Sequence, residues 1–435
     1  MTSPPRSRDD LAKSEAEEPR PLGPKDSLGR LFRRFLRLGS LAWGGPVAQI
    51  EMIRQEIVTQ EKWISPAHFR RLLAIYQVLP GPEAHELCVH LGMIAQGRWG
   101  GFLAGLGFML PGFALMFGLS WLYLEAGPNQ AWLNALVLGL QPAVVALIVR
   151  ACHRLSQHNL TDVSLGLIAG GAATAASWGV SWWLTLPVAG LIYTIITRRP
   201  APAARHVPSS ARRRVLAAAV GLVLLFSLWQ NQYTNADAAH STHPERSVHF
   251  ALDHAKPPQV APLILLGSGL RAGLLTFGGA YTAIPFLKAD AVDRGDWMST
   301  NDFLDGVALA GILPAPLIIF ATFVGYFAGG AYGALAITLG IFLPAFGFSL
   351  IFFRQLEAAM AVRGLRAFLE GVTAGVIGLI IFTAGTLIIM YLRTPLAGTI
   401  FAGALVCLTV FRSRWSVPLT IGGAGVASWA LTGLF

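Results

Sequence analysis

Residues 36–46, LRLGSLAWGGP, and residues 270–280, LRAGLLTFGGA, are two versions of one motif, and their repetition decides the fold of this chain. Sliding the sequence by 234 positions aligns residues 36–82 with residues 270–316 without a gap. After one deletion the match resumes, again at glycine and proline positions. Matching Gly, Pro and Trp at fixed spacing indicate internal duplication, so the chain is predicted to be two copies of one unit.

A second motif closes each aligned stretch, LPGP at residues 79–82 and LPAP at residues 313–316. Proline removes a backbone donor and glycine frees the backbone, so a continuous helix is expected to break at both motifs of each copy. At membrane depth a break is tolerated only where the backbone faces protein or a wet cavity. Four broken segments are therefore expected to point towards one shared cavity. The alternative is that these residues only permit kinks or close helix packing.

The composition predicts a membrane protein, because 54% of the residues are hydrophobic and only 13% are charged, against about 25% charged in soluble domains. Crossing a bilayer takes roughly 20 apolar residues. Candidate spans lie at residues 100–124, 131–149, 163–177, 178–196, 215–229, 331–353, 368–392, 396–411 and 417–435. The predicted fold class is an all-α polytopic membrane protein with two inverted-topology repeats and broken helices.

The inversion is predicted from basic residues in the loops, which favour the cytoplasmic side. Arg150 and Arg154 lie in the second loop of the first copy, whereas Arg354 and Arg363 lie in the first loop of the second copy. Equivalent loops would then face opposite sides of the membrane. The apolar segment 215–229 has no partner in the repeat and supplies the extra crossing that inversion requires. The N-terminus is expected to be cytoplasmic.

The net charge of +10 arises from basic residues clustered beside apolar spans, a pattern typical of membrane topology and not of nucleic-acid binding. The histidines of the polar loop could bind a metal or belong to a solvated linker; no metal or cofactor is predicted. The expected organisation is a disordered cytoplasmic tail at 1–29, an N-terminal repeat at 30–200, a linker with one crossing and a polar extracytoplasmic loop at 201–258, and an inverted C-terminal repeat at 259–435.

Broken helices expose N-terminal amides and the positive end of the helix dipole, which suit an anion. Arg37 and Arg271 are matched cations ahead of the GG motifs; they could attract the anion or extend to lipid headgroups. The predicted substrate-binding residues are Gly44, Gly45, Pro46, Gln77, Pro80, Gly81, Pro82, Gly278, Gly279, Pro314, Pro316, Arg37 and Arg271.

Three ionisable residues, Glu83, His85 and Glu86, follow Pro82 directly. A charge inside the membrane is costly, so they are candidates for proton coupling, and His85 could meet the anion itself. The alternative is a wet, inert helix end at the interface. A zinc-protease motif is excluded, because His85 and His90 are five positions apart and a rotation of about 140° separates them on a helix.

Taken together, the strings WGGPVAQI, QVLPGP, LLTFGGAYTAIPFL, GDWMSTNDFLDGVALAGILPAP and FATFVGYFAGG resemble the signatures of the chromate transporter family in its long two-domain form. The resemblance covers roughly residues 30–392. It implies a secondary transporter, not an enzyme, that moves chromate and sulfate-like dianions across the plasma membrane, exporting chromate and conferring resistance. Ala280, Ala315 and residues 83–86 depart from the commoner pattern of the family.

Two other functions stay open on the sequence alone. An anion channel could be built on the same site and would show conductance without coupling. A membrane-embedded enzyme acting on lipid phosphates would need clustered acids or a metal motif, and the sequence has neither a DxxxD nor a CxxC constellation. The expected partners are a small inorganic oxyanion and the lipid bilayer, and the oligomer expected by default is a C2 homodimer.

Overall fold

The protein was analysed as a computed structural model. It describes residues 27–43, 45–77, 79–126, 131–197, 259–277, 280–352, 363–392, 394–411, 413 and 415–432. Over these residues the chain is helical, and the only β pairing is an isolated bridge. The predicted crossing at residues 215–229 and the predicted tail and polar loop lie outside the described residues.

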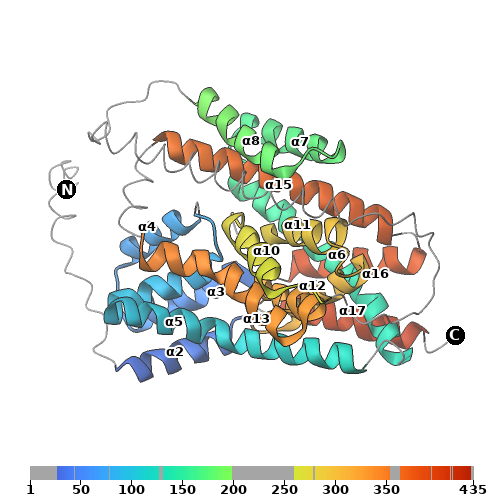
Figure 1. Cartoon of the computed structure of the whole chain (residues 1–435), viewed down its shortest axis with the longest axis horizontal. Coiled ribbons are helices and arrows are strands. Elements are labelled where there is room, and N and C mark those ends of the chain that lie inside the picture. Colours follow the sequence, from blue (N-terminus) through green and yellow to red (C-terminus); the bar gives the residue numbers. More distant parts are fainter. Residues whose placement is uncertain are drawn as a thin grey trace, which may run out of the picture.

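The helices occur in two runs that follow the predicted repeat (Figure 1). The first run is α2 (Leu28–Ser40), α3 (Gly45–Ile53), η1 (Arg54–Gln60), α4 (Pro66–Tyr76), α5 (Glu83–Ala126), α6 (Ala131–Asn159), α7 (Val163–Ser177) and α8 (Trp182–Ile196). The second is α10 (Pro262–Leu274), η2 (Ala280–Thr282), α11 (Ala283–Lys288), η3 (Ala289–Arg294), α12 (Thr300–Ile312), η4 (Leu317–Ile319), α13 (Phe320–Leu350), α15 (Arg363–Tyr391), α16 (Pro395–Val410) and α17 (Ser416–Thr432).

Irregular backbone occurs at equivalent places in the two runs. Both η1 and η3 are π-helical turns, a rare element. Each is followed by a non-glycine residue in the left-handed region, Lys62 with φ 55° and Asp296 with φ 47°. Because non-glycine residues seldom adopt positive φ, the shared position indicates that the two units share detailed backbone geometry as well as sequence.

A sharp turn divides α5 and α13, so each is a hairpin of two helical limbs. In α5 the turn is at Gln96 and Gly97, where Gly97 has φ 64° and ψ −158°. In α13 it is at Gly329 and Gly330, where Gly330 has φ 61° and ψ −152°. The sequence aligns Gly97 with Gly330 but did not reveal the turn. The second limb of α5, residues 98–126, is about 43 Å long and sufficient to cross a bilayer.

Close glycine contacts hold each hairpin together. A Cβ atom added to Gly92 would lie 2.4 Å from the carbonyl oxygen of Gly100, and one added to Gly325 would lie 2.4 Å from that of Gly333. Such distances are far below van der Waals contact. The two limbs therefore cross at their backbones, as small residues allow between membrane helices.

The two runs exchange their last helices, as the layers of Figure 1 show. Helices α7 and α8 of the first run pack on α15 of the second, and α16 and α17 of the second pack on α6 of the first. Close approaches occur in both sets: a Cβ on Gly378 would lie 2.3 Å from the Ala169 carbonyl oxygen, and one on Gly139 would lie 2.3 Å from that of Ala424. The halves therefore form one interlocked body.

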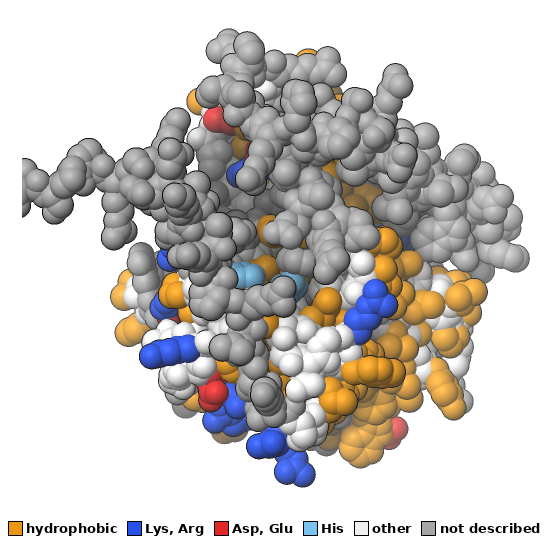
Figure 2. Space-filling model, turned by 90° about the vertical axis from the view of Figure 1, so that its left-hand side faces the viewer, with side chains coloured by type: hydrophobic (Ala, Val, Ile, Leu, Met, Phe, Trp, Pro, Cys, Tyr) orange, Lys and Arg blue, Asp and Glu red, His pale blue; other side chains and the backbone are white. Residues whose placement is uncertain are grey.

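The outer surface is apolar, as expected for a protein solvated by lipid. Three segments among the described residues are long and apolar enough to cross a membrane, Glu83–Glu125, Leu317–Leu350 and Gly364–Tyr391, although the first two contain the hairpin turns. Figure 2 views the end of the molecule that is on the left in Figure 1, where Lys and Arg side chains lie beside exposed apolar ones. Large exposed apolar side chains include Trp121, Leu122, Leu167, Leu191, Leu339, Val406 and Leu419. An apolar surface of this extent is unusual for a soluble monomer, and the predicted class of an all-α membrane protein is confirmed.

Candidate functional site

Each of the four repeated motifs interrupts the helical path. Helix α2 ends at Ser40 and α3 begins at Gly45, so WGGP falls at the break, and α4 ends before LPGP with α5 beginning at Glu83. In the second half α10 ends at Leu274 before FGGA, and α12 ends at Ile312 before LPAP. The expected breaks are therefore present at all four motifs.

The four motifs converge on one small cavity between the halves. Its lining combines one residue from WGGP, one from LPGP, one from FGGA and one from LPAP with three neighbours: Pro46, Pro82, Ala280, Pro316, Gln49, Glu83 and Ala84. The cavity leaves about 10 Å³ for the centre of a water-sized sphere, which is room for about one water molecule. The helix ends must move apart to admit a tetrahedral oxyanion.

Backbone contacts join the glycine motif of one half to the proline motif of the other. The Gly81 amide donates to the Thr276 carbonyl oxygen at 2.7 Å. Next to this bond, Pro80 and Phe277 form the isolated antiparallel bridge. Pro80 is thus in contact with the FGGA segment across the interface between the halves, and the cavity depends on both copies.

Four helix starts lie around the cavity, and their first turns can supply amide donors to an anion. Helices α3 and α5 and the short helices η2 and η4 each begin within one residue of a lining residue. The first turn of a helix has amide N–H groups without intrahelical partners, together with about half a positive charge from the helix dipole. Several helix starts beside one cavity can therefore attract an anion without a lysine or arginine in the apolar interior.

Gln49 is a functional candidate that the sequence reasoning missed. Its side chain is 1% exposed, lines the cavity and donates from Nε2 to the Ala42 carbonyl oxygen at 2.8 Å. The equivalent residue in the second half is Ala283. The signal that could have identified Gln49 is that the first copy has a polar residue where the second copy has alanine.

Several predicted substrate-binding residues do not line the cavity or fall outside the described residues. Gly44, Gly278 and Gly279 are outside the described residues. Gln77 is the C-terminal cap of α4 and does not line the cavity, and neither does Pro314. Gly45 and Gly81 have positive φ values of 78° and 149°, as expected where the backbone turns sharply.

Arg37 and Arg271 do not line the cavity and are ion-paired with equivalent acids. Arg37 Nη2 lies 2.5 Å from Glu56 Oε1, and Arg271 Nη2 lies 2.6 Å from Asp290 Oδ2. The two acids occupy matched positions of the repeat, so each half contains the equivalent ion pair. The first pair is open to solvent on the arginine side, since Arg37 is 62% and Glu56 14% exposed, whereas Arg271 is 15% and Asp290 7% exposed.

The buried pair is expected to matter more for stability than the exposed one. Asp290 also accepts from Ser268 at 2.7 Å and from Arg294 at 3.0 Å, so Asp290→Asn leaves Arg271 without its charge partner in a nearly dry site. We expect a loss of about 3 kcal/mol. The matched Glu56→Gln change should cost about 1 kcal/mol or less. Thermal unfolding of both variants in detergent measures the difference, and equal losses would contradict it.

The three ionisable residues after Pro82 are buried inside the protein. Glu83 is 7% exposed, and His85 and Glu86 are 0% exposed. The His85 ring packs between Phe342 and Phe346, with centroids 4.9 Å and 4.7 Å away. His85 is therefore not among the cavity residues, whereas Glu83 is. No group of metal-ligating side chains occurs within the described part of the chain.

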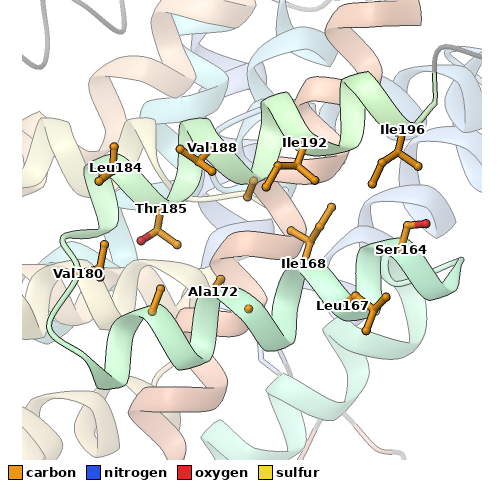
Figure 3. A pocket seen from close by; sticks show the side chains of 13 residues that line it. Ser164, Leu167, Ile168, Ala172, Val180, Leu184, Thr185, Val188, Ile192 and Ile196 are labelled. Atoms are coloured by element: carbon orange, nitrogen blue, oxygen red, sulfur yellow. The ribbon is translucent and has the colours of Figure 1, made fainter.

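A larger cavity, of about 510 Å³, is a groove between α7 and α8 (Figure 3). Apart from the hydroxyls of Ser164 and Thr185, the side chains in it are apolar, including Leu167, Ile168 and Ile192. It has no charged side chain and no helix break. An oxyanion would be desolvated there without donors in return, so the groove is a poor candidate for the site.

Comparisons with known proteins agree on one family. The family model described as "Chromate transporter" matches the chain twice, over residues 29–197 and 263–429. A chromate transport protein of Pseudomonas aeruginosa is 51% identical over 410 residues, with 93% of each chain covered. One from Cupriavidus metallidurans is 28% identical, also with 93% of each chain covered, and a probable chromate transport protein of Synechococcus elongatus is 28% identical over 84% of this chain and 85% of its own.

No solved structure matches this chain significantly. The two family-model matches cover both runs of helices, and they include every motif that lines the cavity between the halves. On the identity and coverage of its relatives, this chain belongs to the chromate transporter family.

Proposed function

We propose that this protein is a secondary transporter that moves chromate or a sulfate-like dianion across the plasma membrane, and that the cavity between the halves is its binding site. The observation that carries the proposal is the convergence of all four repeated motifs, with their helix starts, on that one cavity. Discontinuous helices meeting at a repeat interface are the usual substrate site of secondary transporters. The relatives named chromate transport proteins support the same substrate class.

The transport cycle we infer is alternating access. The basic loop residues favour inverted repeats, which would let the cavity open first to one side of the membrane and then to the other. The small volume of the cavity fits an intermediate in which both sides are closed. We further propose that the N-terminus is cytoplasmic, that transport is outward and confers chromate resistance, and that the protein works as a homodimer.

An ion-substitution series in proteoliposomes tests the proposal. Uptake of radiolabelled chromate into inside-out vesicles should be saturable, should require the protein, and should be inhibited by excess sulfate but not by excess chloride. Protein-free liposomes are the control. A conductance that rises linearly with chromate concentration would identify a channel instead, and an absence of chromate and sulfate uptake in active vesicles would contradict the proposed function.

A further inference from the structure

Two buried acids break the symmetry of the repeat beside the cavity. Glu83 and Glu86 follow the LPGP motif directly and are 7% and 0% exposed, whereas the four residues that follow LPAP, Leu317 to Phe320, are all apolar and at most 4% exposed. The second half therefore shows that apolar side chains satisfy the packing at these positions. The first half places two carboxyl groups there instead, at a cost in desolvation that packing alone does not explain.

Glu86 has no polar partner in the described structure. Neither carboxylate oxygen makes a hydrogen bond, and no described Lys or Arg forms an ion pair with it. The carboxyl group lies against Gly81 of the LPGP motif, where an added Cβ would be 2.6 Å from Oε1. The titratable groups near Glu86 are Glu83 and His90, one turn before and one turn after it on α5, and Tyr76 on α4, whose ring centroid is 6.0 Å from that of His90 and whose hydroxyl is 3.2 Å from Ser349 Oγ.

The free-energy balance favours a neutral Glu86 in this closed arrangement. The start of α5 can stabilise a nearby negative charge by at most about 2 kcal/mol. Removing an unpaired carboxylate from water costs several kcal/mol, and nothing else on the described chain compensates. The closed arrangement therefore favours the uncharged carboxyl group, whereas an arrangement open to water favours the charged one, so closing around a bound anion takes up a proton. Glu83, one helical turn earlier on the same face, connects Glu86 to the cavity that Glu83 lines.

We propose that Glu83 and Glu86 form a proton-binding site that fills together with the oxyanion site, so that a proton moves with the anion. The proposal rests on the proposed function of the neighbouring cavity. An ionised carboxylate beside a dianion repels it, and protonation removes that repulsion. By thermodynamic reciprocity, proton binding must then raise the affinity for the anion, and anion binding must raise the affinity for the proton.

Proton uptake by the unmodified protein is the first test. Purified protein in weakly buffered detergent solution is mixed with sulfate, which stays a dianion at neutral pH, and a pH indicator records the protons taken up. We expect about one proton per bound sulfate. Sulfate binding without proton uptake would overturn the proposal and leave the proposed function standing. A failure to bind either sulfate or chromate would instead count against the proposed function itself.

The pH dependence of sulfate binding in variants then shows which carboxyl group binds the proton. In the unmodified protein the sulfate dissociation constant should rise by up to about tenfold per pH unit above the pH at which the carboxyl group of the empty site loses its proton. Glu86→Gln, a neutral side chain of nearly the same shape, should make the dissociation constant independent of pH, and Glu83→Gln should weaken the dependence. Glu51→Gln, at an exposed acid on α3, is the control and should retain the full dependence. A Glu86→Gln protein that elutes as a single folded species and keeps the full dependence would overturn the assignment.

Discussion

Replacing Gly45 by leucine is expected to lower chromate transport about a hundredfold, by analogy with the loss that a displacement of about 1 Å causes in a catalytic site, while leaving the protein folded. Gly45 is the first residue of α3 and has φ 78°, a conformation that leucine adopts only with strain. A Cβ at this position lies 3.4 Å from the Tyr281 hydroxyl of the other half. A leucine would therefore disturb the helix start beside Pro46 and push against the opposite motif.

The matched control for this change is Gly179→Leu. Gly179 has nearly the same backbone angle, φ 76°, but lies in the turn between α7 and α8 with nothing within 4 Å of an added Cβ. It carries the same local strain of about 1–2 kcal/mol without touching the cavity. Uptake into inverted vesicles at equal protein level should therefore fall for Gly45→Leu alone. Equal transport by the two variants would remove Gly45 from the site.

The second large effect is expected on stability, from Gly325→Leu in the hairpin of α13. An added Cβ would lie 2.4 Å from the Gly333 carbonyl oxygen and 2.4 Å from Ile337, so the two limbs would have to separate. Because a backbone atom cannot move aside as a flexible side chain can, we expect a loss of more than about 3 kcal/mol and little folded protein after purification.

Gly347→Leu provides the comparison within the same helix, because nothing lies within 4 Å of an added Cβ there. Leucine also has the higher helix propensity, by somewhat less than 1 kcal/mol, so this variant should be at least as stable as the parent. Thermal unfolding followed by size-exclusion chromatography measures both proteins. A Gly325→Leu variant with unchanged stability would show that the limbs of α13 do not cross at this point.

Local signals predicted the helical class and the four helix breaks. Proline and glycine at LPGP stop a helix for reasons contained in those residues, so the break before Glu83 could be predicted without tertiary information. The hairpin turn at Gln96 and Gly97 was not predicted. Its first limb contains Glu83, Glu86 and two histidines, which lower the hydropathy and conceal a helix that is in fact buried by its neighbours.

The exchange of helices between the halves could not be predicted, because the apolar faces of α7, α8, α16 and α17 have no feature that specifies a partner. The pairing of Arg37 with Glu56 could have been predicted, since Arg271 and Asp290 repeat it at the same spacing of 19 residues. The sequence analysis matched the two arginines but not the two acids, and it therefore assigned the arginines to the anion site. The inverted orientation of the repeats stays a prediction from the loop charges.

The most direct measurement of the central claim is the position of chromium in a structure of the protein with bound chromate, located by anomalous X-ray scattering. The account predicts one peak between the halves, surrounded by Pro46, Pro82, Ala280 and Pro316 and next to Gln49, with the four helix starts drawn apart. A peak in the groove between α7 and α8, or beside Arg37 or Arg271 with the central cavity still closed, would contradict it.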